Sequence, residues 1–288
     1  MQNSTLMDFD KNSWCILSPI EQSIKRKIEA VGVPLKDWNI SINYGIKTGC
    51  NEAFIIDGAT KDALIAQDPK SAEIIRPILR GRDIKRYSYE FADKWLIATH
   101  NGTETQKRID INDYPAVKAH LDSYYAKIAK RDDQGDTPYN LRCCAYWDDF
   151  SKQKIVYGQF QDSAEYAYSD KEIFLSSNEY MIVGSPHMKF LLGVMHSSIF
   201  NWYLRNFTNS LGNSAKIAQK SNFFKVPVVM PNKDNMQMIM KIENLVDINI
   251  ESANANKILQ YKENESKIEK ILCSMYQISE QELVFIRS

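Results

Sequence analysis

Apolar residues recur at helical spacing in two stretches of the first half of the chain. The first stripe consists of Ile20, Ile24, Ile28 and Val31, and the second, after Asp113, of Val117, Leu121, Tyr124 and Ile128. A period of three and four residues predicts amphipathic helices with these side chains inward. Gly32 and Pro34 predict the end of the first helix.

Other segments alternate with a period of two. Ile40, Ile42 and Tyr44 alternate with Ser41 and Asn43, which predicts a strand running into Gly45. Further strands are predicted over residues 154–160 and 180–183, followed by a helix over 187–206. Because short strands alternate irregularly with helices, the pattern predicts a mixed α/β (α+β) fold with an irregular mixed sheet.

The pattern changes after Pro227 and Pro231, which mark a boundary. An apolar helical stripe then runs through Met236, Ile239, Ile242, Val246 and Ile250, weakens around Asn254, and resumes as Ile258, Tyr261, Ile268, Ile271 and Met275. Ser279 and Glu282 form an S-x-x-E capping box that predicts a last short helix. We therefore expect a mixed α/β domain over residues 1–231 and a C-terminal helical segment over residues 232–288.

Composition indicates an ordinary globular protein. The 288 residues are 44% hydrophobic and 25% charged, and 36 basic residues balance 36 acidic ones. No apolar run approaches 18 residues and the N-terminus carries acids, so we expect a cytoplasmic protein without a membrane partner. Five cysteines without a C-x-x-C pair, and only four histidines, do not favour a structural zinc site.

Motifs for cofactor chemistry are absent from the sequence. The eleven glycines never fall two residues apart, so there is no G-x-G turn and no phosphate-binding loop. No catalytic or cofactor-binding residue is therefore assigned. Asp68 with Asp83 and Lys85 leaves one alternative open, a Mg²⁺-dependent nuclease, since carboxylates followed by a lysine can hold a metal and a water.

Charge is distributed unevenly. Residues 180–233 contain no Asp or Glu but carry six cations, namely Lys189, Arg205, Lys216, Lys220, Lys225 and Lys233. A second basic cluster consists of Arg76, Arg80, Arg82, Lys85 and Arg86, with Tyr87 and Tyr89 nearby. Residues 131–179 hold ten acids against five basic residues and are expected to face away from phosphate. Two separate basic segments in a neutral chain favour a nucleic-acid groove, although a buried helix would also account for the acid-free window.

A series of segments resembles one known family in its order along the chain. These segments are GIKTGCNEAFIID (45–57), IRPILRGRDI (75–84), KIVY (154–157) after YW (146–147), LLGVMHS (191–197), VPV (226–228), and the tail from IEKI (268–271) to SEQE (279–282). Together they resemble the TaqI-like C-terminal specificity domain of N6-adenine DNA methyltransferases, including type IIG restriction-modification enzymes.

The resemblance implies a DNA target-recognition domain over residues 1–231. Its expected partners are double-stranded DNA and a methyltransferase domain or subunit, which would carry S-adenosylmethionine, and Mg²⁺ if it also cleaves DNA. No cofactor is expected in this chain. The glycines around Lys47 and Thr48 predict a tight loop able to meet a phosphate. The predicted DNA-binding residues are Lys47, Thr48, Asn51, Arg80, Arg82, Lys85, Arg86, Asn213, Lys216 and Lys220.

Two alternatives to the recognition domain remain open. The first is the nuclease that uses Asp68, Asp83 and Lys85, which Mg²⁺-dependent cleavage by the purified chain would identify. The second is a protein-interaction module, which a DNA-independent partner would identify.

Overall fold

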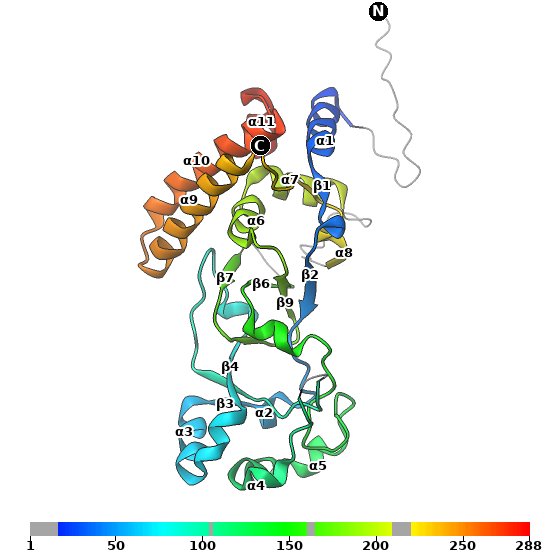
Figure 1. Ribbon diagram of the computed structural model, residues 1–288, viewed down its shortest axis with the longest axis vertical. Coiled ribbons are helices and arrows are strands. Elements are labelled where there is room, and N and C mark those ends of the chain that lie inside the picture. The colour runs from blue at the N-terminus through cyan, green and yellow to red at the C-terminus, as the bar shows by residue number, and fades with distance from the viewer. Residues whose placement is uncertain (1–16, 104–105, 160–164, 209–219) are drawn as a thin grey trace, which may run out of the picture.

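The computed structural model describes residues 17–103, 106–159, 165–208 and 220–288. It confirms the mixed α/β fold class. Figure 1 shows an elongated molecule with most long helices at one end, a sheet with short helices at the other end, and a second sheet between them.

The central sheet separates two hydrophobic cores. Its strand order is β2-β9-β6-β7, and all three pairings are antiparallel. Alternate residues of its strands point to opposite faces, so Ile155 and Tyr157 join one core while Val156, between them, joins the other. The strands are β2 (Ser41–Tyr44), β6 (Lys154–Gly158), β7 (Tyr166–Ser169) and β9 (Glu179–Val183).

The second sheet, with the order β3-β5-β4-β8, lies at the end of the molecule away from the long helices (Figure 1). Only the β4–β8 pairing is parallel. The strands are β3 (Ile55–Asp57), β4 (Ile75–Leu79), β5 (Lys94–Ile97) and β8 (Phe174–Leu175). The surrounding helices are α2 (Asn51–Phe54), α3 (Gly58–Gln67), α4 (Pro115–Asp122), α5 (Tyr125–Ile128) and the 3₁₀ turns η2 (Pro69–Ile74), η3 (Gly81–Asp83), η4 (Ile111–Asp113) and η5 (Trp147–Ser151).

The helical end contains residues from both ends of the chain. Its elements are α1 (Pro19–Val31), α6 (Met188–Met195), α7 (Ser198–Phe207), α8 (Lys220–Phe223), α9 (Met236–Asn254), α10 (Ile258–Tyr276), α11 (Glu280–Arg287), the turn η1 (Leu35–Asp37) and the pair β1 (Val33–Pro34) with β10 (Pro227–Val228). Their apolar faces form one core with the central sheet, so this core includes residues on both sides of Pro231.

Close packing between α6 and α9 depends on Gly193. A Cβ atom at this position would lie 2.9 Å from Ile242 Cγ2 and 3.0 Å from Val246 Cγ2. Glycine therefore allows the two helices to approach more closely than another residue would. The predicted stripe of Ile239, Ile242 and Val246 is fully buried at this contact.

Several predicted helix ends are confirmed. Gly32 follows the last residue of α1, as predicted. The start of α1 is a capping box of Ser18 and Glu21, with Pro19 as the first residue, which was not predicted. The predicted capping box of Ser279 and Glu282 opens α11. These local signals specify helix ends because they satisfy backbone N–H groups that have no partner inside the helix.

Two predicted helices are each divided in the structure. The prediction of one helix over residues 187–206 is wrong, because Ser197 adopts an extended conformation between α6 and α7 and its hydroxyl accepts a hydrogen bond from Phe200 N. The helix predicted after Asp113 is likewise divided, at Ser123 and Tyr124, into α4 and α5. The apolar period continues across both breaks, so periodicity alone does not reveal them. The predicted strand 154–160 ends at Gly158 within the described residues.

In the described part of the chain, no helix combines the length and hydropathy needed to cross a bilayer. Its cysteines, Cys50, Cys143, Cys144 and Cys273, are free thiols.

Candidate nucleic-acid interface

Three chain segments pass from one sheet to the other and meet at the boundary between the sheets. We call the region where residues 45–51, 80–87 and 175–179 meet the sheet joint. Residues 45–46 leave β2 and bridge to Ser176, residues 80–87 leave β4 and bridge to β7, and residues 175–179 connect β8 to β9. Strands that change sheets commonly form such corners.

Backbone hydrogen bonds hold the segments of the sheet joint together. Ile46 N donates to Leu175 O at 2.7 Å, and Ser176 N donates to Leu79 O at 2.9 Å. Gly45 N donates to Glu179 O at 2.8 Å. The 175–179 segment therefore lies between the loop that carries Lys47 and the segment that carries Arg80 and Arg82, whose residues are among the predicted DNA contacts.

The glycine loop, residues 45–50, begins with a glycine that packing requires. A Cβ atom on Gly45 would lie 1.9 Å from Ser176 O, so only glycine permits the crossing between sheets. Gly49 has φ +66°, in the left-handed region that favours glycine. Lys47, between these two glycines, is exposed.

Thr48 is used inside this loop rather than at its surface. It is 1% exposed, its hydroxyl donates to Asn51 Oδ1 at 2.6 Å, and the hydroxyl oxygen accepts from Cys50 N at 3.2 Å. Asn51, by contrast, is exposed at the start of α2. The predicted contacts of this loop thus divide into two exposed residues, Lys47 and Asn51, and one internal residue.

Arg131 supports the glycine loop from inside the protein. Its guanidinium donates to the carbonyl oxygens of Thr48, Asp133, Pro138 and Asn140, and lies over the Phe54 ring at 4.3 Å. Burial lowers the pKa of Arg131 to about 10. Arg131 was not among the predicted site residues, and no local sequence motif identifies it, because its partners are backbone carbonyls.

The arginine turn, residues 80–83, has one arginine in an ion pair, Arg80, and one exposed arginine, Arg82. Arg80 forms a bidentate ion pair with Asp83, with Nη2 to Oδ1 at 2.8 Å and Nε to Oδ2 at 2.9 Å. Arg82 is exposed, and Lys85 Nζ donates to the Arg82 carbonyl at 2.9 Å. Arg82 is therefore the arginine of this turn best placed to contact a phosphate.

The same ion pair bears on the nuclease alternative. Both oxygens of Asp83 accept hydrogen bonds from Arg80, while Asp68 caps η2, on the other side of β4 in the chain. Among the described residues, no group of three or more His, Cys, Asp or Glu side chains is arranged to hold a metal. The geometry of Asp68 and Asp83 gives the nuclease alternative no support.

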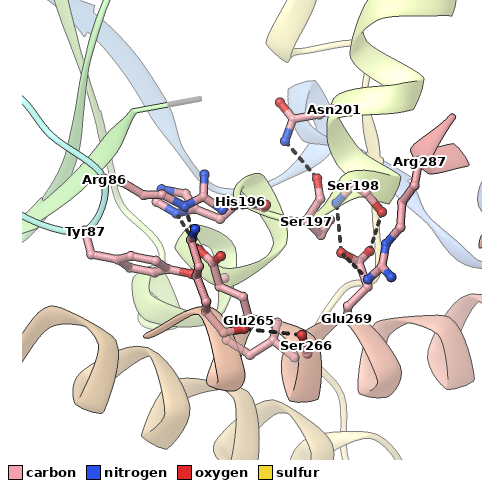
Figure 2. A pocket seen from close by; sticks show the side chains of 13 residues that line it. Arg86, Tyr87, His196, Ser197, Ser198, Asn201, Glu265, Ser266, Glu269 and Arg287 are labelled. Atoms are coloured by element: carbon pink, nitrogen blue, oxygen red, sulfur yellow. Dashed lines mark hydrogen bonds and ion pairs between the residues drawn. The ribbon is translucent and has the colours of Figure 1, made fainter. Parts of the chain in front are cut away.

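Arg86 points away from the other predicted contacts and into the helical end. Arg86 Nε lies 2.6 Å from Glu265 Oε1 of α10, and Nη2 donates to His196 O at 3.1 Å. Figure 2 shows this pair in the wall of a cavity of about 400 Å³ between the 80–87 segment, α7 and α10. Arg86 therefore connects the second sheet to the helical end.

The cavity in Figure 2 contains a neutral histidine. Burial and the charge of Arg86 hold the pKa of His196 well below its usual value, and its Nε2 lies 3.0 Å from Tyr166 O. A carbonyl only accepts, so Nε2 carries the proton. Glu269, also in the wall, accepts from the backbone and hydroxyl of Ser198. Arg86, Glu265 and Glu269 thus hold neighbouring segments of the cavity wall together.

A row of aromatic rings crosses the central sheet from α8 to the glycine loop. Phe223 stacks on Tyr157 at 4.9 Å, Tyr157 on Tyr180 at 5.2 Å, and Tyr180 contacts Tyr44 at 4.6 Å. Lys220 lies at one end of the row, on α8, and Tyr44 at the other end is 44% exposed. The strand pattern placed Tyr44 with the inward residues Ile40 and Ile42, so its exposure was missed.

The structure therefore brings together part of the predicted site. Lys47, Asn51, Arg80, Arg82 and Lys85 lie at or beside the sheet joint, whereas Lys220 lies on α8, at the helical end. Arg86 is engaged elsewhere. Asn213 and Lys216 lie outside the described residues.

Comparisons with known proteins agree with the resemblance seen in the sequence. Residues 76–228 match the family described as TaqI-like C-terminal specificity domain. This range includes the arginine turn but not the glycine loop or the helical tail. No curated protein sequence matches this chain.

Two solved structures share the fold. One is the type IIL restriction-modification enzyme MmeI in complex with DNA, with 15% identity, a TM-score of 0.66, and coverage of 88% of this chain and 35% of that chain. The other is the type IIG restriction endonuclease BpuSI, with 14% identity, a TM-score of 0.53, and coverage of 90% and 33%. This chain thus spans about a third of the length of each enzyme. Since the family match extends over more than half of its residues, the chain belongs to the family of TaqI-like C-terminal specificity domains.

Proposed function

We propose that this chain recognises duplex DNA through the sheet joint. The observation that carries the proposal is the placement of two exposed cations, Lys47 and Arg82, on loops that flank the same 175–179 segment. Cations on adjacent loops can contact neighbouring phosphates of one duplex and fix its position. The similarity of the fold to an enzyme solved with DNA supports this assignment.

Neighbouring residues extend the proposed surface. Lys85 and Asn51 add a cation and an amide beside the two loops, and the exposed ring of Tyr44 offers a flat apolar face for a base or sugar. Lys220 lies on α8, beyond the buried rings of Phe223, Tyr157 and Tyr180, and its contact with DNA stays a prediction. Arg80, already paired with Asp83, shapes the turn more than it adds positive charge.

We further propose that the chain positions DNA for a methyltransferase domain or subunit. That partner would bind S-adenosylmethionine, extrude the target adenine and methylate it at N6, and it would use Mg²⁺ if the system also cleaves DNA. The family membership and the size of the similar enzymes support this division of labour. In this scheme the present chain supplies specificity and contributes no catalytic group.

The proposal is tested by measuring binding of the purified chain to random duplexes and to a duplex containing the target site, identified by mapping N6-methyladenine in the source genome. We expect binding to both, with tighter binding to the target site. Lys47→Ala should weaken binding about equally on the two duplexes, because a phosphate contact carries no sequence information. Absence of binding to either duplex would contradict the proposal, and a protein partner captured without DNA would instead favour the protein-interaction module.

A further inference from the structure

One buried carboxylate lies directly behind the proposed DNA surface. Glu179 is 5% exposed and is the first residue of β9. Its Oε1 accepts a hydrogen bond from Gly81 N at 2.8 Å, and its Oε2 accepts one from the Ser176 hydroxyl. Its backbone carbonyl accepts from Gly45 N at 2.8 Å. A single residue therefore contacts the arginine turn through its side chain and the glycine loop through its backbone.

Burying a carboxylate at this position costs folding free energy. Burial raises the pKa of Glu179 to about 7, against the opposing effect of the hydrogen bonds from Ser176 and Gly81. Arg80, on the same turn, is bound to Asp83 and does not form an ion pair with Glu179 in the described structure. A buried acid without a contacting cation costs stability unless its oxygens accept well-placed hydrogen bonds.

The contacts of the Gly81 amide explain what the carboxylate does. Gly81 is the first residue of η3, and the next residue is the exposed Arg82. The hydrogen bond from Gly81 N to Glu179 thus fixes the backbone immediately before the side chain proposed to contact phosphate. A Cβ atom at Gly81 would lie only 2.9 Å from Glu179 Oε1, so the turn lies directly against the carboxylate.

We propose that Glu179 is a positioning residue for DNA binding, which holds the arginine turn in a fixed place relative to the glycine loop so that Arg82 and Lys47 contact one duplex together. This inference rests on the proposed function of the sheet joint. It requires an acceptor at Oε1 rather than a negative charge. Glutamine retains an oxygen acceptor, and its amide nitrogen can donate to Ser176 Oγ, whereas alanine retains neither.

The test compares three variants of the full chain, Glu179→Gln, Glu179→Ala and Gly81→Ala, by their affinity for a duplex and the dependence of that affinity on salt. We expect Glu179→Gln to bind within about threefold of the unmodified chain and Glu179→Ala to bind at least about tenfold more weakly. The salt dependence of Glu179→Ala should be shallower by about 1 in log-log slope, because one phosphate contact is lost. Gly81→Ala displaces the carboxylate from the amide without removing it, and should also lose about tenfold.

Ile242→Ala serves as the control for general destabilisation, because Ile242 is buried between α6 and α9 in the helical end. It should retain DNA affinity. If Glu179→Ala does not fold, Gly81→Ala decides the question. The positioning role is wrong if the folded alanine variants bind as tightly as the unmodified chain, or if Glu179→Gln loses as much affinity as Glu179→Ala. If the unmodified chain binds no DNA, the proposed function itself fails, which is a different outcome.

Discussion

Neighbouring basic residues of the 76–86 cluster perform different tasks. Arg80 pairs with Asp83 three residues away, Arg82 faces solvent, and Arg86 pairs with Glu265, which lies 179 residues further along the chain. The sequence predicts the basic cluster. The three-residue separation of Arg80 and Asp83 is compatible with a local ion pair. The sequence cannot predict the partner of Arg86, because that contact exists only after α10 has packed against the 80–87 segment.

These different roles predict different effects of two arginine substitutions on the free energy of unfolding. Arg86→Ala leaves Glu265 without its cation in a partly buried site, and should lower the free energy of unfolding by about 1–3 kcal/mol. Arg82→Ala removes an exposed side chain and should change stability by less than about 0.5 kcal/mol. Urea unfolding of both variants measures this difference. Equal stability of the two variants would show that the Arg86–Glu265 pair contributes nothing.

The lowered pKa of Glu282 predicts that the stability of the protein depends on pH. Burial alone would raise its pKa, but hydrogen bonds from Lys27, Ser279 and Ser23 lower the pKa of Glu282 to about 2. Because the folded state lowers the pKa, the stabilisation is complete above the unfolded value near 4.5 and is lost as the pH falls toward 2.

Glu282→Gln should therefore lower the free energy of unfolding at neutral pH by about 1–3 kcal/mol. It should also reduce the further loss of stability on acidification to pH about 3. Unfolding measured at both pH values tests this, with Glu280→Gln, an exposed carboxylate two residues earlier, as the control. A pH dependence identical to that of the unmodified chain would exclude Glu282 as its source.

At the level of elements, the sequence predicted most helices but not where they break. The stripes of α1 and α9 and the capping box at Ser279 are local signals, and they place these elements correctly. The break at Ser197 was missed because apolar residues continue on both sides of it, so the apolar period gives no sign of the interruption. The sheet joint was also out of reach, since strand pairing between distant segments leaves no local pattern.

The buried stripe of α9 predicts how strongly the C-terminal helices are held. Ile242 is 0% exposed, whereas Ile258, at the start of α10, is 53% exposed. Ile242→Ala should lower the free energy of unfolding by about 2–5 kcal/mol, because it removes buried methyl groups and leaves a cavity. Ile258→Ala should cost less than about 0.5 kcal/mol. Similar small losses for both variants would mean that α9 is not packed as described.

At the level of the whole molecule, the central sheet places two cores on its two faces and the proposed DNA surface at its boundary with the second sheet. A chain with 36 basic and 36 acidic residues has no overall attraction for DNA, so binding must depend on local placement of cations. The acidic segment 131–179 contributes to this placement from within. It supplies Arg131 behind the glycine loop and Glu179 behind the arginine turn.

The division of labour predicts that the isolated chain does not bind S-adenosylmethionine. The expectation derives from the lack of any G-x-G turn in the sequence. Calorimetric titration of the chain with the cofactor should give no saturable heat at micromolar concentrations. Saturable binding would reveal a cofactor site that the sequence motifs do not describe.

The central claim, that the sheet joint binds DNA, is tested most directly by the salt dependence of duplex binding for the unmodified chain and the Lys47→Ala and Arg82→Ala variants. With about four to six phosphate contacts, the log-log slope for the unmodified chain should be about −4 to −5. Each variant should bind more weakly at low salt, and the slope should be shallower by about 1 for each phosphate contact removed. Unchanged affinity and slope in both variants would contradict the account and place the DNA surface elsewhere on the molecule.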